Sequence, residues 1–370
     1  MRAIASCRTE VLGGHLEVCP CCAFQQPAYN SCRDRHCPKC QSSQQIEWVQ
    51  ERLKHILPAP HFHVVFTVPE ALKEVALGHR EKFYELLLRT AAQTLLELGH
   101  NPKYLGAELG VTTVLHTWTR DLRFHPHVHC IVTGGGLTRD GTRWRPVKGG
   151  YLFPVRVLSS LFRGKLMHAV EELWNVGEWR SKTLSSQRQF NQLKARLYQQ
   201  PWVAYAKKPF GGPAQIFRYL GQYTHRVALS NHRLLALDDQ GVRFITRGRT
   251  TVTLTADEFI SRFLLHVLPR GFRKIRHYGL YAAGNVPTRL AAAQALFARR
   301  KRHFPVGLRL VALCFSVAFM SLPFHFGLGD WLDFFTANRC PRCGALLERR
   351  PLAAPPASAP TPSAPPLDSS

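Results

Sequence analysis

Apolar residues recur along the chain with two periods, one typical of helices and the other of strands. The helical period predicts helices over residues 46–57, 70–100 with a break near Gly78, 156–200, 215–227 and 257–268. Runs of branched and aromatic residues predict strands over residues 63–68, 111–119 and 127–133, and the glycines at 134–136 end the last of them. Residues 233–254 alternate as in a short meander that turns at residues 239–241.

Three segments depart from that pattern. Up to about residue 45 the chain is rich in cysteine and poor in periodic apolar residues, so this segment lacks the side chains for a core of its own. Residues 350–370 are mostly Pro, Ala and Ser, a composition that predicts disorder. The apolar run over residues 310–322 is too short to cross a bilayer comfortably and is expected to be a buried helix or strand.

The charge of the chain narrows the choice of partners. Its 370 residues include 49 Lys and Arg against 24 Asp and Glu, a formal net charge of +25, and 45% of the residues are apolar. The apolar content excludes a wholly disordered, collagen-like or coiled-coil chain. The charge favours a polyanion, and nucleic acid fits better than a membrane surface because no basic amphipathic helix stands out. The N-terminus lacks the features of a secretory signal, so a cytoplasmic protein is expected.

Cysteine and histidine gather in the first 40 residues, as expected of metal ligands in a reducing compartment. Two Cys-x-x-Cys knuckles, Cys19/Cys22 and Cys37/Cys40, are spaced as in a zinc ribbon and are predicted to hold one structural zinc ion. Four thiolates close a tetrahedral site, which supplies the folding free energy that a core would otherwise provide. The remaining candidates form a possible second site whose existence ligand type alone leaves open: Cys7, His15, Cys32 and His36. A third knuckle, Cys340/Cys343, has no obvious second half.

A row of histidines begins the predicted strand at 127–133. Side chains on a strand alternate faces, so His125, His127 and His129 can project to one side. Two imidazoles at neighbouring positions form a clamp for a divalent cation, with His116 as the nearest third ligand and Asp121 as the second choice. The alternative is a solvated or core-lining row. The pair His61/His63 has the same spacing without a third histidine and is not expected to take part.

Two tyrosines lie four residues apart in the predicted helix at 215–227. The spacing places Tyr219 and Tyr223 on one helix face, where two phenols can act as nucleophiles on phosphodiesters in one site. Arg218, His225 and Arg226 are placed to bind phosphate. Packing of an aromatic pair in the core is the alternative.

These stretches together resemble a known family. They occur in the order CRTEVLGGH, YNSCRDRHCPKCQ, HFHVVFTVP, LGAELGVTTVLHTW, HPHVHCIVTGGGL, YLFPV, FRYLGQYTHRVALSNHR and FLLHVLPRGFRKIRHYG, over about residues 5 to 282. With them the chain resembles the transposases of the IS91 family, rolling-circle elements whose enzymes belong to the HUH (His, hydrophobic, His) endonucleases.

The resemblance implies an α+β fold in which a zinc-ribbon-like domain precedes an HUH-type palm, a central antiparallel sheet with flanking helices. The implied division is a zinc-binding domain over 1–45, a linker helix over 46–60, a catalytic domain over 61–285, a C-terminal region with the third knuckle over 286–349, and a disordered tail over 350–370. It implies His127 and His129 as ligands of Mg²⁺ or Mn²⁺, and Tyr219 and Tyr223 as nucleophiles.

The implied activity is nicking and joining of single-stranded DNA at the ends of a mobile element, through 5′-phosphotyrosine intermediates. Basic residues such as Arg218 and Arg226 would contact the strand, and structural zinc would hold the N-terminal domain. Two alternatives stay open: a plasmid replication initiator or relaxase with the same chemistry, and a zinc-dependent DNA-binding protein without activity, such as a decayed transposase.

Overall fold

The computed structural model describes residues 2–34, 36–37, 39–40, 51–180, 184–200, 202–207, 229, 233–302 and 339–352. The chain divides into two compact units. Unit 1 consists of residues 1–40 and 318–370, and unit 2 consists of residues 41–317.

Unit 2 is built on an antiparallel sheet whose strands run in the order β11-β4-β5-β3-β7, with β6 paired to β5. Its strands are β3 (His61–Thr67), β4 (Glu108–Trp118), β5 (Phe124–Leu137), β6 (Trp144–Pro146), β7 (Ala204–Lys207) and β11 (Ile275–Gly279). The two longest, β4 and β5, form a hairpin at the centre of this sheet. The three predicted strands at 63–68, 111–119 and 127–133 correspond to β3, β4 and β5, and the expected mixture of helices with a central antiparallel sheet is confirmed.

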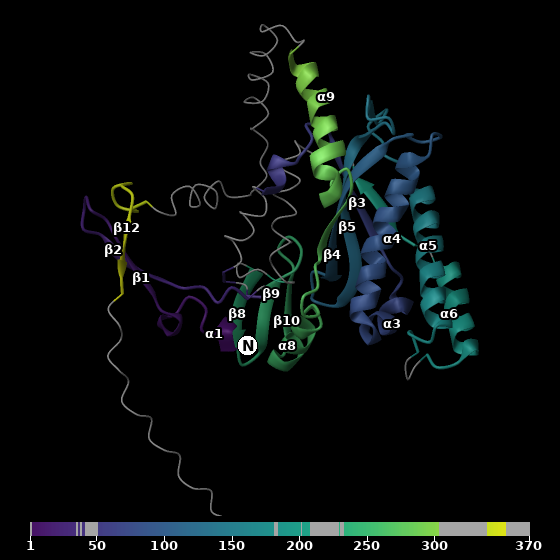
Figure 1. Ribbon diagram of the computed structural model, residues 1–370. Helices are drawn as coiled ribbons and strands as arrows, with labels where there is room; N and C mark the ends of the chain where they lie inside the picture. The colour runs from purple at the N-terminus through teal and green to yellow at the C-terminus, as the bar shows by residue number, and fades with distance from the viewer. Residues whose placement is uncertain are drawn as a thin grey trace, which may run out of the picture. The chain divides into compact units, whose positions relative to one another are not determined.

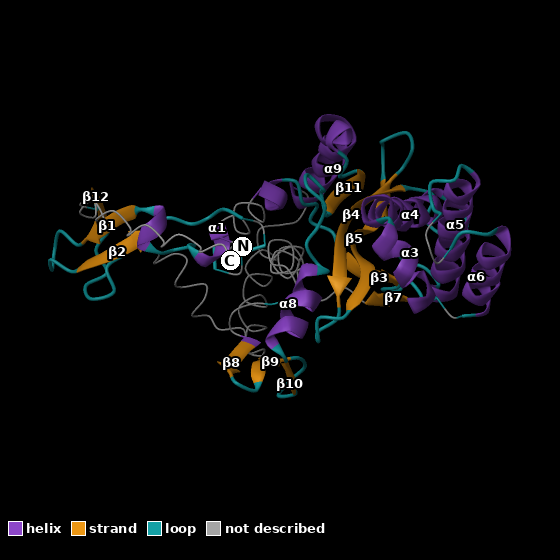
Figure 2. Cartoon of the chain, turned by 90° about the horizontal axis from the view of Figure 1, so that it is seen from below, coloured by secondary structure: helices purple, strands orange, loops and turns teal. Residues whose placement is uncertain are grey.

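Helices lie on one side of this sheet, with α6 outermost, as both views show (Figures 1 and 2). They are α3 (Lys73–Gly78), α4 (Arg80–His100), α5 (Val155–Asn175) and α6 (Gln187–Gln199), and the break at Gly78 falls where the sequence predicts it. Phe62 and Val64 of β3 and Val128 of β5 point to this face and belong to one core with Leu87 of α4 and Phe162 of α5. Each such fully buried side chain stabilises the fold by roughly 1.5–3 kcal/mol. Because side chains alternate, the opposite face receives His63, His127 and His129.

The glycine triplet does not end β5, contrary to the sequence expectation. The strand continues to Leu137, and the pairing with β4 shifts between Leu109 and Val111. A Cβ at Gly134 would lie 2.8 Å from the carbonyl oxygen of Pro60, and a Cβ at Gly136 would lie 2.6 Å from that of Glu108. Glycine therefore allows neighbouring backbone to approach the strand closely, rather than turning the chain.

A small sheet in the order β10-β9-β8 and the helix α8 pack against the turn of the β4–β5 hairpin. These elements are β8 (Leu234–Asp238), β9 (Gly241–Ile245), β10 (Thr251–Leu254) and α8 (Ala256–Leu264), close to the meander and helix that the sequence predicts. Phe244 and Leu254 share a core with Leu122 of the hairpin turn. His266 contacts β4 through Thr117 Oγ1 at 3.2 Å and the hairpin turn through the carbonyl oxygen of Leu122 at 3.0 Å. These contacts hold the turn of the hairpin that carries the histidines.

The described part of unit 2 ends with the π-helical turn η5 (Val286–Leu290) and α9 (Ala291–Arg302). They form a second core with Leu137 and Trp144 at the end of the sheet. Short 3-10 turns lie at η2 (Glu70–Leu72) and η4 (Ala283–Asn285). Of the expected linker helix at 46–60, residues 51–60 are described; residues 51–54 are helical and residues 55–60 are not, so the helix ends earlier than the sequence predicts. No helix among the described residues is both long and apolar enough to span a bilayer, and the apolar run at 310–322 lies outside them.

Unit 1 is a three-stranded antiparallel sheet in the order β12-β1-β2, preceded by α1 (Arg2–Ala5) and η1 (Glu10–Leu12). Its strands are β1 (Gly14–Val18), β2 (Gln25–Tyr29) and β12 (Glu348–Pro351). Arg350 and Pro351 pair with Leu16 and His15 of β1, so the predicted disordered tail does not begin at residue 350. The rest of that prediction, residues 353–370, lies outside the described residues. The sequence reasoning missed this strand because four residues without apolar alternation carry no strand signal.

Candidate functional site

Three histidines converge on the face of the sheet opposite the helices. His116 of β4 lies directly across from His127 of β5, and His129 follows two residues later on the same face of β5. Their candidate ligand nitrogens all lie within 4.8 Å of one another. The ring centroids of His116 and His129 are 4.1 Å apart, and those of His127 and His129 are 5.0 Å apart. The structure thus brings together His127, His129 and the third ligand expected from the sequence, His116.

Hydrogen bonds orient two of these rings. The carbonyl oxygen of His125 lies 2.7 Å from Nδ1 of His127 and can only accept a hydrogen bond, so Nδ1 carries the proton and Nε2 has a free lone pair. Nδ1 of His129 lies 2.7 Å from Nε2 of His63, which lies one strand away on β3. When His129 donates this bond, its own Nε2 is also available as a ligand.

Burial keeps these imidazoles neutral. It lowers the pKa of His127 to about 4 and that of His63 to about 4. Burial, followed by the neighbouring imidazoles, holds the pKa values of His116 and His129 well below the ordinary value for histidine. A neutral imidazole is the form that coordinates a metal. The cluster therefore offers three neutral nitrogen donors to one cation.

Other candidates from the sequence have different surroundings. Asp121 accepts hydrogen bonds from Thr119 Oγ1 and, at 2.7 Å, from Nε of Arg123, so it stabilises the hairpin turn and is outside the histidine group. Nδ1 of His61 lies 2.8 Å from the carbonyl oxygen of Ala59, and its Nε2 lies 2.8 Å from Tyr281 Oη, as expected of a core histidine. His63, by contrast, touches the cluster. This contact follows from the register of β3 against β5, in which Val65 lies opposite His129, and alternation within 61–67 alone does not separate His63 from His61.

The predicted nucleophiles and phosphate ligands, Tyr219, Tyr223, Arg218 and Arg226, lie outside the described residues. Two described tyrosines on this sheet are alternatives. Tyr205 of β7 is about half exposed and pairs with Val65 of β3, which also pairs with His129, so it shares the histidine face. Tyr278 of β11 packs against the core on the helix side, where burial raises its pKa.

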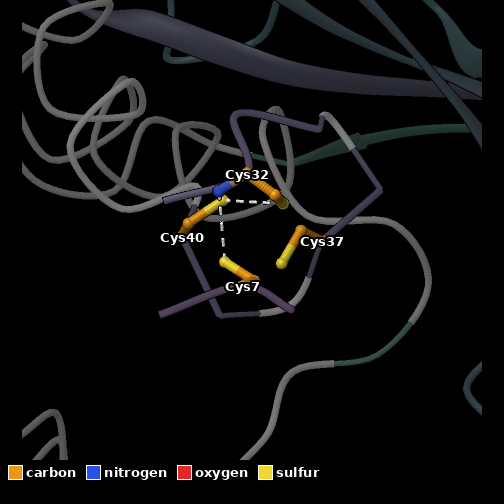
Figure 3. A group of neighbouring side chains, drawn as sticks. All are labelled: Cys7, Cys32, Cys37 and Cys40. Carbon is orange, nitrogen blue, oxygen red and sulfur yellow. Dashed lines mark hydrogen bonds between the residues drawn. The ribbon is translucent and has the colours of Figure 1, made fainter. Parts of the chain in front are cut away.

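Eight of the described cysteines form two clusters, and both differ from the grouping expected from the sequence. The N-terminal cluster consists of Cys7, Cys32, Cys37 and Cys40, and its sulfurs all lie within 4.8 Å of one another (Figure 3). The bridging cluster consists of Cys19, Cys22, Cys340 and Cys343.

The expected site of Cys19, Cys22, Cys37 and Cys40 is therefore corrected, because the two knuckles belong to different clusters. Of the second expected set, Cys7 and Cys32 join the N-terminal cluster. His15 and His36 lie outside both clusters, beside Glu17 and Asp34 respectively.

Comparison with known proteins identifies the class. Residues 1–68 match the family model of a "Transposase zinc-binding domain", and residues 110–289 match a family described as "Putative transposase". The chain is 46% identical over 289 residues to the "Putative transposase y4qJ" of Sinorhizobium fredii, covering 75% of this chain and 73% of that one. It is 26% identical to the "Transposase for insertion sequence element IS801" of Pseudomonas savastanoi pv. phaseolicola, covering 75% and 68%.

Among solved structures, the conjugative relaxase TrwC bound to oriT DNA and metal matches 44% of this chain and 69% of its own, with a TM-score of 0.25 and 15% identity. The relatives and the two family models define a DNA transposase with a zinc-binding domain. The chain belongs to the IS91 family of transposases. Its partner is DNA, on which a transposase cuts and joins strands.

Proposed function

We propose that this transposase nicks and joins single-stranded DNA by the HUH mechanism, with a divalent cation at His116, His127 and His129 and with Tyr219 and Tyr223 as nucleophiles. The convergence of one buried and two half-buried imidazoles, all with lowered pKa values, on the sheet face opposite the helices is the observation that carries the proposal. A sheet face has no structural need for three adjacent desolvated histidines, because apolar side chains would pack there at lower cost. The tyrosines and the histidines also fall within the same matched region, residues 110–289.

The donor set fits a divalent cation with open coordination positions. Three imidazoles leave room for oxygens of a phosphodiester. Of the two metals considered, Mn²⁺ suits nitrogen donors better than Mg²⁺, which prefers an oxygen environment. A cation held there would polarise the scissile phosphate and stabilise the charge that develops on it.

The proposed chemistry needs no energy source. The phenolic oxygen of Tyr219 or Tyr223 attacks the phosphorus, the bond to the 3′ oxygen breaks, and the phenolic proton ends on that oxygen as a 3′ hydroxyl. The 5′ side stays attached to the enzyme as a phosphotyrosine ester. The reverse attack by another 3′ hydroxyl joins a new strand and releases the tyrosine. A second tyrosine on the same face of the predicted helix would allow a second strand to be held at the same time.

The proposal is tested by incubating the protein with Mn²⁺ and single-stranded DNA from the flanks of its own gene. A covalent protein–DNA adduct that survives denaturation, with a free 3′ hydroxyl on the released piece, is the expected result. DNA binding without any adduct across the flanking sequences would instead favour a binding protein without activity.

The affinity for DNA is expected to fall steeply with salt. The net charge of +25 is spread along the chain rather than held in one tail, so that many Lys and Arg residues can neutralise phosphates. A strand held through roughly six to ten phosphate contacts loses about 10³–10⁵-fold in affinity between about 50 and 200 mM salt. Fluorescence anisotropy with labelled single strands at several salt concentrations measures this slope. A flat dependence would mean that stacking or apolar contacts, not phosphate contacts, dominate.

His63 is proposed as a positioning residue for His129. Replacing it by alanine removes the acceptor that holds the proton on Nδ1 of His129, so Mn²⁺ affinity is expected to fall about 10- to 100-fold. His63→Gln, which can still accept the bond through its amide oxygen, should restore part of the affinity. The matched control is His277→Ala, since His277 bonds to Thr112 at 2.9 Å and lies outside the histidine group. Isothermal titration with Mn²⁺ gives the affinities, and equal losses for His63→Ala and His277→Ala would contradict a specific role.

A further inference from the structure

We propose that Cys19, Cys22, Cys340 and Cys343 hold a zinc ion of their own, which joins the segment 339–352 to the N-terminal strands. The Sγ atoms of Cys19 and Cys343 are 3.4 Å apart, and so are those of Cys22 and Cys340. Sulfurs in a tetrahedral zinc site stand about 3.8 Å apart, whereas a disulfide requires about 2.0 Å. The matched zinc-binding family covers residues 1–68 and includes neither Cys340 nor Cys343.

The two halves of the bridging cluster are the same motif. Both have the sequence Cys-Pro-x-Cys, and in each the next residue has a positive φ, +55° at Ala23 and +74° at Gly344. The amide of Ala23 donates to the carbonyl of Cys19 at 3.1 Å, and the amide of Gly344 donates to that of Cys340 at 2.9 Å. Two copies of one turn, one at each end of the chain, therefore present four sulfurs to a common point.

The left-handed conformation of Ala23 supports the same conclusion. A residue with a Cβ adopts this region at a cost of about 1 kcal/mol, so something in the surroundings must hold the turn. The turn joins β1 to β2, and the amide of Cys19 also bonds to the carbonyl oxygen of Phe24 at 2.8 Å. Ligation of Cys19 and Cys22 by one ion requires this tight turn.

Among the described residues, the segment 339–352 has few other contacts with β1 and β2, and one of them is Arg342, whose guanidinium lies 5.2 Å from the ring centroid of Phe24. All four residues of β12 are exposed. They pair antiparallel with β1, from Pro351 opposite His15 to Glu348 opposite Val18. In unit 1 the described apolar cluster consists of the N-terminal cysteines with Ile4 packed against them. A short strand with exposed side chains is marginal by itself, whereas a closed thiolate site contributes folding free energy directly. Ligation at Cys340 and Cys343 therefore accounts for the ordered pairing of β12.

This site makes the zinc-binding domain discontinuous. Unit 1 draws its residues from both sides of the catalytic unit, residues 41–317. The two cysteine clusters share no residue, so the protein is expected to hold two zinc ions in unit 1. Loss of the bridging ion would free the segment 339–352 while leaving the N-terminal cluster intact.

The first experiment counts zinc by native mass spectrometry in the full-length protein and in paired serine variants. The wild type should hold two zinc ions in unit 1, measured in metal-free buffer without added Mn²⁺. Cys340→Ser with Cys343→Ser should hold one, as should Cys19→Ser with Cys22→Ser. The variant with all four changes should also hold one, because both pairs serve the same ion. Two ions in the Cys340/Cys343 variant, or none in the fourfold variant, would overturn the proposal.

The second experiment needs no variant and so does not depend on whether variants fold. Cys21 and Cys343 are both exposed thiols, yet Cys343 belongs to the bridging cluster and Cys21 does not. Iodoacetamide should therefore label Cys21 in the zinc-loaded wild type and label Cys343 only after zinc is chelated. Peptide mapping by mass spectrometry resolves the two positions. Equal labelling of Cys21 and Cys343 in the loaded protein would contradict ligation at Cys343.

Discussion

His127→Ala combined with His129→Ala is expected to abolish nicking of single-stranded DNA while leaving its binding largely intact. The variant removes two of three imidazoles that lie within 4.8 Å of one another, and a lone His116 cannot hold a divalent cation in place. Metal stabilisation of the transition state is worth several kcal/mol, so the rate should fall at least about a thousandfold. Affinity for the strand, which rests on many phosphate contacts, should change less than about twofold.

The comparison needs a histidine variant that lies away from the cluster. His168 on α5 is exposed and pairs with Glu172 on the helix surface, so His168→Ala should nick at the wild-type rate. Cleavage rates are measured in a gel assay with excess enzyme, with Mn²⁺ and with chelator. The wild type in chelator should match the double histidine variant. If that variant nicked at a tenth of the wild-type rate or better, the cluster would not be the metal site.

The histidine cluster was largely predictable because its geometry is local. His127 and His129 share a strand face through the alternation of side chains, and a short turn places His116 of the preceding strand beside them. The contact between His63 and His129 depends on the register of β3 against β5, in which His63 lies opposite Ile131. No spacing within either segment encodes that register, so His63 was set aside with His61.

The cysteine pairing was not predictable from spacing. Cys19/Cys22 and Cys37/Cys40 are close in the chain, and proximity favours a single site. The β1–β2 hairpin instead places Cys19/Cys22 at its turn, while Cys37/Cys40 meet Cys7 and Cys32. The partner of the hairpin turn is Cys340/Cys343, which follows the whole of unit 2 in the chain. The sequence signal was a knuckle without a second half nearby, and the structure identifies its partner through the distances between the sulfurs.

The glycines at 134–136 also show that a local sequence signal can be overridden by contacts from distant segments. Three consecutive glycines are a strong local signal for the end of a strand. In the structure, the backbone oxygens of Pro60 and Glu108 approach them so closely that side chains would not fit. Tertiary contacts thus decide between a turn and a crowded strand, and these contacts come from segments far apart in the chain.

Tyr219→Phe combined with Tyr223→Phe is expected to eliminate the covalent adduct with single-stranded DNA. Each change removes a hydroxyl and keeps the ring, so a pair that serves only for packing would leave activity nearly normal. Nucleophilic attack requires the phenolic oxygen, so the double variant should form no phosphotyrosine ester. Single variants should lose part or all of the reaction, depending on which tyrosine attacks first. Denaturing gels with end-labelled DNA detect the adduct, and peptide mapping identifies the modified residue.

Tyr205 and Tyr278 provide the controls that make this test decisive. Tyr205 lies on the histidine face of the sheet, so it is the described tyrosine best placed to replace the predicted pair. Tyr278 packs on the helix side of the sheet, where burial raises its pKa, so it faces away from DNA bound on the histidine face. Tyr205→Phe and Tyr278→Phe should therefore both retain the adduct. An adduct that survived in the Tyr219/Tyr223 double variant but disappeared in Tyr205→Phe would move the nucleophile to β7, because it would show that the phenol on the histidine face of the sheet, not the predicted tyrosine pair, attacks the DNA.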